Sequence, residues 1–234
     1  MRFYYDGDSF SCLLPEGQTV TAGHILSEKL DSKLDHYGFP GKNPLQIIRS
    51  AVRYTFSQPE DSFMAIGIGV PERLEFYNEN AITKPFQADD YKHWNSETCI
   101  ETLQGHRAID DRKSKRWLGR QTIDMFDWRY AQTTTLLNCI LLNDFLSLAN
   151  CNFIIHNLNV DYDRSNYLFN DGVKEQIIAR PRIINFYENS LHSLLERNNI
   201  KPWDYDKYKW IGHPDEAGHL MYADFLWEHI KKYV

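Results

Sequence analysis

Ser9 and His213 lie near the two ends of the 234-residue chain. Their residue types and surroundings are those best suited to nucleophilic catalysis. Ser9 follows an aromatic run and belongs to the hexapeptide DGDSFS, residues 6–11. A serine hydroxyl becomes a nucleophile when a neighbouring base, commonly an imidazole, removes its proton. The alternative is that Ser9 only caps a helix or closes a tight turn.

His213 is the best candidate for that base among the nine histidines. It stands in a Gly-His-Pro turn, where Pro214 blocks earlier helix formation and Asp215 favours a helix start. A histidine on such a loop can point at the edge of a sheet, although backbone hydrogen bonds could equally account for it. His219 falls inside the following helix, where packing or capping explains it better.

The elements that must position these two residues alternate between strands and helices, which predicts an α/β fold with a mostly parallel sheet. Ligands bind outside the carboxyl ends of the strands in such sheets, so Ser9 and the loop at 38–44 should share that edge. We expect one domain over 1–234, with an insertion at about 78–130. The expected strands are 2–5, 62–70 and 151–158, with a very short one before residue 35, and the expected helices are 19–33, 45–56, 127–149, 182–198 and 215–232.

Three motifs together resemble the SGNH (GDSL-type) hydrolases, and most closely their divergent phage-encoded and bacterial members. The motifs are DGDSFS at 6–11, GFPGKNP at 38–44 and HPDEAGH at 213–219, accompanied by PERLEF at 71–76. The resemblance implies a three-layer α/β/α sandwich with a flavodoxin-like central sheet. It also implies that Ser9 is the nucleophile and His213 the general base.

In this family the negatively charged oxygen of the reaction intermediate is bound by three donors, which form an oxyanion hole. They are the N–H of the serine, a glycine N–H in the second motif and an asparagine side chain in the third. Gly41 matches the glycine, and a residue without a side chain lets its amide approach the charge closely. The third motif lacks its asparagine, because the strand ends GIGVPER at 67–73. Asn43 could supply the missing donor, or it could cap the helix that follows.

A second departure concerns the acid that normally orients the histidine. The family places an aspartate three residues before it, and here that position is Trp210. A backbone carbonyl could serve instead, Asp206 or Asp204 could reach the imidazole, or the site is impaired. An aromatic residue at this position could also form a wall of the substrate pocket.

Composition and charge limit the partners, the cellular location and the cofactors that we expect for this protein. A net charge of −6 gives no support for a nucleic-acid partner. No apolar run approaches the ~20 residues of a membrane span, and no signal segment is recognisable. Scattered cysteines without a CxxC pair favour reduced thiols in the cytoplasm, or in the host cytoplasm or virion for a phage-encoded member. We expect no metal and no cofactor, since Asp161 and Asp163 near His156 match no ligand spacing.

The sequence therefore predicts a serine esterase that cleaves a small-molecule or carbohydrate ester, such as an O-acetyl group, through a Ser-His acyl-enzyme mechanism. The alternative is a non-catalytic SGNH-like binding or structural module, for example a virion-associated one, which the two departures from the family pattern would explain. A flavodoxin-like nucleotide-binding protein is a weaker third reading, because the loop after Gly7 lacks a glycine pattern that cradles phosphate. The oligomeric state is left open.

Overall fold

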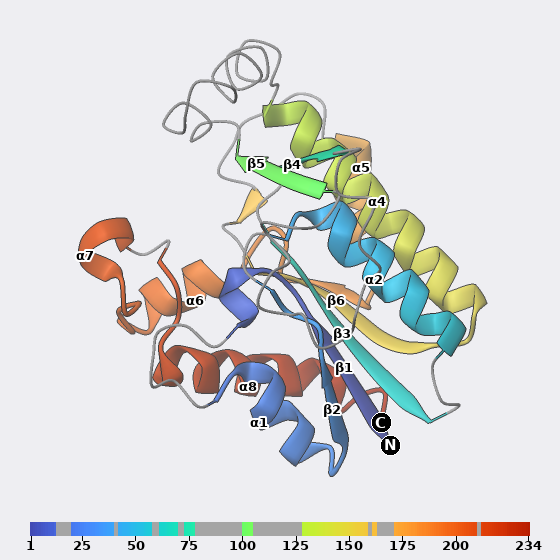
Figure 1. Ribbon diagram of the computed structural model, residues 1–234, viewed down its shortest axis with the longest axis horizontal. Helices are drawn as coiled ribbons and strands as arrows, with labels where there is room; N and C mark the ends of the chain where they lie inside the picture. The colour runs from blue at the N-terminus through green and yellow to red at the C-terminus, as the bar shows by residue number, and fades with distance from the viewer. Residues whose placement is uncertain are drawn as a thin grey trace.

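Five parallel strands form the central sheet of the computed structural model (Figure 1). The structure describes residues 1–12, 20–39, 42–57, 61–69, 73–77, 100–104, 128–158, 161–162, 171–209 and 212–234. The strand order is β2-β1-β3-β6-β7, the doubly wound order of flavodoxin-like sheets counted along this sheet. The strands are β1 (Arg2–Asp6), β2 (Lys33–His36), β3 (Ser62–Ile68), β6 (Asn152–Asn157) and β7 (Ile183–Ile184).

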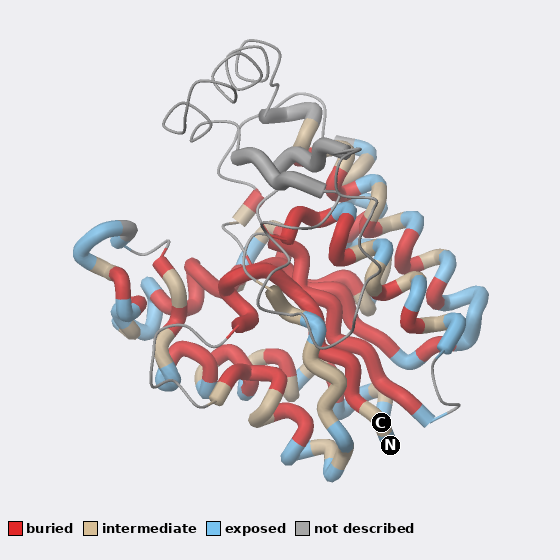
Figure 2. Tube along the Cα trace, viewed as in Figure 1, coloured by how far each residue is buried: buried red, intermediate tan, exposed pale blue. Residues whose placement is uncertain are grey.

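Helices cover both faces of this sheet, so the central strands β1, β3 and β6 are buried along nearly their whole length (Figure 2). Alternate residues of β1 enter opposite layers: Phe3 and Tyr5 pack on one face and Tyr4 on the other. The arrangement is the three-layer α/β/α sandwich that the sequence predicts. The first face carries α1 (Ala22–Lys29), α6 (Leu191–Arg197) and α8 (Glu216–Ile230), and the second carries α2 (Pro44–Ser57), α4 (Trp128–Leu148) and α5 (Asp171–Ile178).

The smaller elements complete the described chain. A 3₁₀ turn, η1 (Ser9–Ser11), follows β1, and α7 (Tyr205–Tyr208) precedes α8. A separate antiparallel pair consists of β4 (Arg73–Tyr77) and β5 (Ile100–Gln104). Most of the expected insertion at 78–130 lies outside the described residues, so its extent and the one-domain division stay predictions.

Two sequence expectations were wrong in detail. The helix expected at 182–198 is instead β7, a turn and α6, because Asn185 and Asn189 adopt positive φ angles of 55° and 60° that interrupt a helix. The helix expected at 45–56 exists as α2, but its apolar spacing, which puts Leu45 and Phe56 in register, indicates the wrong buried face, since these two side chains are 42% and 81% exposed. Ile47, Ala51 and Tyr54 form its buried face, because α2 meets the sheet along the next row of side chains.

His156 of β6 is fully buried against α8 of the first helical layer. Its Nδ1 is 2.9 Å from the Tyr222 hydroxyl, which donates to the carbonyl of Asn157 at 2.9 Å. Burial lowers the pKa of His156 to about 3, and it lowers the pKa values of His36 and His219 to about 4. All three histidines are therefore held neutral in the folded protein.

These histidines should make the fold acid-sensitive. The unfolded chain takes up their protons near pH 6.5 and the folded chain only near pH 3–4, so stability is full above pH 6.5 and declines as the pH falls through this window. Each histidine contributes a slope of at most about 1.4 kcal/mol per pH unit. Urea denaturation should give a smaller free energy of unfolding at pH 5 than at pH 7, and His156→Gln should reduce the difference. Equal free energies at both pH values in the wild type would contradict this explanation.

Candidate active site

Ser9 lies at the carboxyl edge of the sheet, three residues beyond the end of β1. Asp8 is the N-cap of η1, and its carboxylate accepts a hydrogen bond from the Phe10 amide at 3.0 Å. The Asp8 carbonyl accepts a second bond from the Ser11 amide at 3.1 Å. Thus Asp8, not Ser9, performs the capping role, and the Ser9 hydroxyl is left for another partner.

That partner is His213, which reaches Ser9 from the other end of the chain. The Nε2 atom of His213 is 3.0 Å from Oγ of Ser9. The loop that carries His213 leads into α8, where the Asp215 carboxylate caps the helix by accepting from the Gly218 amide at 2.8 Å. The structure therefore brings the two sequence-predicted residues into hydrogen-bond contact across 204 positions of the chain.

Asp204 supplies the carboxylate at the far side of the imidazole. Its Oδ2 is 2.6 Å from Nδ1 of His213, and its Oδ1 accepts the backbone N–H of His213, also at 2.6 Å. An acceptor at Nδ1 assigns the ring proton to that atom and leaves Nε2 to accept the Ser9 hydroxyl proton. Of the alternatives that the sequence left open, it is Asp204 that reaches the ring, whereas Asp206 is exposed and Trp210 lies outside the described residues.

Aromatic rings enclose the imidazole of His213. The Phe10 ring is stacked on it with centroids 4.9 Å apart, and the Trp203 ring is stacked at 6.0 Å. The backbone N–H of Trp203 also donates to the His213 carbonyl at 3.2 Å. Trp203 is 47% exposed, so it presents an aromatic surface to solvent beside the serine–histidine pair.

Asn43 is buried and performs the capping role that the sequence offered as one of its two alternatives. Its side-chain Oδ1 accepts from the backbone N–H of Gln46 at 2.8 Å, and its backbone N–H donates to Oε1 of Gln46 at 3.0 Å, as in a capping box. The Nδ2 of Asn43 forms no hydrogen bond with any residue that the structure describes. Its use as an oxyanion donor stays a proposal, and Gly41 lies outside the described residues.

Gly69, in the segment GIGVPER at 67–73, lies against the carboxylate of Asp8. It directly follows β3, and a Cβ at this position would lie 2.2 Å from Oδ2 of Asp8. The carboxylate that caps η1 therefore occupies the space that a side chain would need. Local motifs could not identify this glycine, because the contact joins the segments that follow two different strands, β1 and β3.

No group of three or more metal-binding side chains forms within the described ranges. Asp161 instead accepts hydrogen bonds from the Ser190 amide at 3.0 Å and from the Ser193 hydroxyl, and Asp163 lies outside these ranges. No helix in the same part of the chain is long and apolar enough to cross a membrane.

Comparisons with known proteins find similarity at the level of structure. Neither a protein-family model nor a curated protein sequence matches the chain. Among solved structures, a G-D-S-L family lipolytic protein of Veillonella parvula is 16% identical, with a TM-score of 0.47 over 97% of this chain and 96% of that one. A catalytic mutant of an acetylxylan esterase of Geobacillus stearothermophilus is 11% identical, with a TM-score of 0.46 over 98% and 93%.

A further similar structure is an α/β hydrolase enzyme from the metagenome of Lake Arreo, Spain, at 12% identity and a TM-score of 0.49 over 100% of this chain and 96% of that one. Identities and scores this low decide neither the substrate nor the roles of individual residues. The phage-type placement, the cytoplasmic location and the lack of a nucleic-acid partner stay predictions.

Gly212 provides a direct test of how the Asp204 carboxylate is held. A Cβ at this position would lie 2.2 Å from Oδ1 of Asp204 and 2.9 Å from Cβ of Pro202, so Gly212→Ala must displace the buried carboxylate. We expect a loss of about 1–3 kcal/mol of stability, as for overpacked cores. Gly172→Ala in α5, where nothing lies within 4 Å, should leave stability unchanged or raise it. Equal unfolding free energies for the two variants would contradict the geometry described.

Proposed function

We propose that this protein is a serine ester hydrolase in which Ser9, His213 and Asp204 act as a catalytic triad. The observation that carries the proposal is the continuous line of hydrogen bonds from Asp204 through both ring nitrogens of His213 to the Ser9 hydroxyl. This line contains a nucleophile, a base within reach of its proton, and an acid that orients the base. A serine that only capped a helix would need no such partner.

The reaction proceeds in two halves. Ser9 Oγ attacks the ester carbonyl carbon while Nε2 of His213 takes the hydroxyl proton, and Asp204 stabilises the imidazolium that forms. The tetrahedral intermediate collapses, the C–O bond to the alcohol breaks, and Nε2 returns its proton to the leaving oxygen. A water molecule then attacks the acyl-serine with His213 again as base, which releases the carboxylic acid and restores Ser9.

The charge that develops on the carbonyl oxygen requires hydrogen-bond donors. We assign this role to the backbone amides of Ser9 and Gly41 and to Nδ2 of Asn43. Asn43 suits it because its Oδ1 is held by the cap of α2, which fixes the amide plane and leaves Nδ2 without a partner among the described residues. The segment 67–73 has no asparagine to donate a third hydrogen bond. The motif at 38–44 would therefore supply two of the three donors, the Gly41 amide and the Asn43 side chain.

Esters of short acyl groups, including O-acetyl groups on carbohydrates, are the substrates to test first. The exposed Trp203 ring beside His213 would form one wall of the site that binds the alcohol part of the ester. The flat face of an indole suits the apolar face of a sugar ring or an aromatic alcohol. The non-catalytic binding module that the sequence left as an alternative is the outcome to accept if Ser9 proves unreactive.

Ser9→Ala tests the nucleophile. Hydrolysis of p-nitrophenyl acetate should fall by at least about 10³-fold, and a fluorophosphonate probe should label the wild type at Ser9 but not the variant. Ser11→Ala removes the neighbouring hydroxyl, which donates to the Asp8 carbonyl and does not contact His213 among the described residues, and labelling should persist. A folded wild-type protein that the probe leaves unlabelled would exclude the hydrolase and favour the binding module.

Asp204→Asn tests the orienting acid, and the matched control is Asp206→Asn two residues away. The amide removes the charge that stabilises the imidazolium and disfavours the ring tautomer with its proton on Nδ1, so kcat should fall by about 10²–10⁴-fold. The exposed Asp206 should tolerate the same change with kcat intact. If the two variants had equal kcat values, Asp204 would have no part in the reaction.

A further inference from the structure

A buried ion pair joins the last residue of β1 to the loop after β2. Nζ of Lys42 is 2.7 Å from Oδ1 of Asp6, and the two side chains are only 4% and 0% exposed. Neither residue belongs to the proposed triad or to the oxyanion donors. Burying two charges is costly unless each is fully bonded, so the pair calls for an explanation.

Both partners have further hydrogen bonds that fix the geometry of the pair. The Asp6 carboxylate also accepts from the Gly7 amide at 2.7 Å and from the Tyr4 hydroxyl at 2.6 Å. The Lys42 ammonium also donates to the Tyr37 carbonyl at 2.8 Å and to the Ser50 hydroxyl at 3.4 Å. The pair therefore links β1, the chain after β2 and helix α2 at one point.

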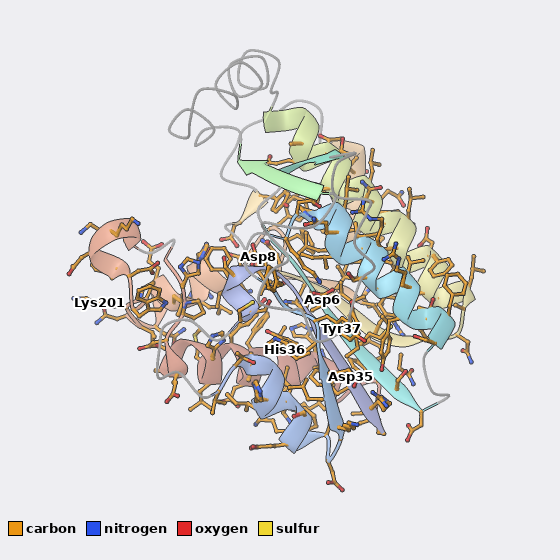
Figure 3. The ribbon with its side chains drawn as sticks, in the orientation of Figure 1. Asp6, Asp8, Asp35, His36, Tyr37 and Lys201 are labelled. Carbon is orange, nitrogen blue, oxygen red and sulfur yellow. The ribbon has the colours of Figure 1, made fainter. Side chains whose placement is uncertain are left out.

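Backbone hydrogen bonds also join the chain after β2 to residues 5–7, which lead to Ser9. Beyond the end of β2, the Tyr37 amide donates to the Tyr5 carbonyl at 2.8 Å and the Phe39 amide donates to the Gly7 carbonyl at 3.1 Å. The Lys42 amide then donates to the Phe39 carbonyl at 3.3 Å. Figure 3 labels Asp6, Asp8 and Tyr37, which belong to the two segments joined in this way.

Lys42 stands directly between Gly41 and Asn43 in the chain, and Asp6 stands three residues before Ser9. Burial raises the pKa of Asp6 above its ordinary value, while the Lys42 ammonium acts in the opposite direction. The ammonium, together with the Tyr4 hydroxyl and the Gly7 amide, favours the carboxylate form of Asp6. Replacing a buried ion pair by hydrophobic residues is often neutral or stabilising, so stability alone does not explain this pair.

We propose that Asp6 and Lys42 are a pair of positioning residues, which set the distance between the Ser9 nucleophile and the proposed oxyanion donor on Asn43, the residue after Lys42. The inference rests on the proposed function. It assigns to this pair a role in the rate of acyl transfer and not in substrate affinity. Positioning of this kind has large effects, since a displacement of about 1 Å can cost on the order of 10²-fold in rate.

The chain contains a control pair on the same strand. Arg2, the first residue of β1, forms an ion pair with Asp35 of β2, and its Nε donates to Oδ2 of Asp35 at 2.6 Å. This pair joins β1 to β2 itself, and it lies four positions further from Ser9 along β1. It tests whether any ion pair between these strands affects the reaction.

The experiment compares Lys42→Met, Lys42→Arg and the double variant Asp6→Asn/Lys42→Gln with Arg2→Met, using p-nitrophenyl acetate and rates counted per fluorophosphonate-reactive site. Lys42→Met should lower kcat by about 10- to 100-fold with KM changed less than about 3-fold. Lys42→Arg should recover part of kcat, and the double variant should lose no more than Lys42→Met, since both disrupt one unit. Arg2→Met should keep the wild-type kcat.

Three results would overturn the inference: a kcat for Lys42→Met within about 2-fold of wild type, an equal loss in Arg2→Met, or a loss confined to KM. If Lys42→Met does not fold, the comparison of Lys42→Arg and the double variant with Arg2→Met decides by the same criteria. Failure of the proposed function would differ from all of these, because Ser9→Ala would then retain the wild-type rate.

Discussion

The candidate site depends on two hydrogen bonds to the Asp204 carboxylate, which holds both the backbone and the imidazole ring of His213. Oδ1 accepts the backbone N–H and Oδ2 accepts Nδ1, each at 2.6 Å. The first bond fixes where the loop before α8 passes, and the second fixes which way the imidazole faces. A side chain on Gly212 would intrude on this carboxylate, so the glycine belongs to the same constraint.

The parallel sheet accounts for the meeting of the two chain ends. β1 lies between β2 and β3, so its carboxyl end stands beside the point between β1 and β3 where the strand order reverses, which is where ligands bind in doubly wound folds. The Asp8 carboxylate turns the chain there into η1 and presents Ser9, while Asp215 begins α8 just after His213. Ser9 and His213 thus each lie beside a helix start that is capped by a neighbouring aspartate.

Much of the fold and part of the candidate site could be predicted from the sequence, for physical reasons that differ between elements. The apolar runs of β3 and β6 indicate strands buried on both faces, and the structure has them. Ser9 and His213 were found from local motifs. The choice of Asp204 over Asp206 could not be predicted, because it depends on the tertiary contacts between residues 203–204 and His213. The buried face of α2 depends on the angle at which the helix packs on the sheet.

The central claim is that Ser9, His213 and Asp204 act as one unit, and its most direct test is the additivity of their removal. Kcat for ester hydrolysis should be measured for Ser9→Ala, His213→Ala, Asp204→Ala and the triple variant. Residues that act together give a triple variant no slower than the slowest single variant, within about 3-fold. A triple variant whose loss equals the product of the three separate losses would contradict the account.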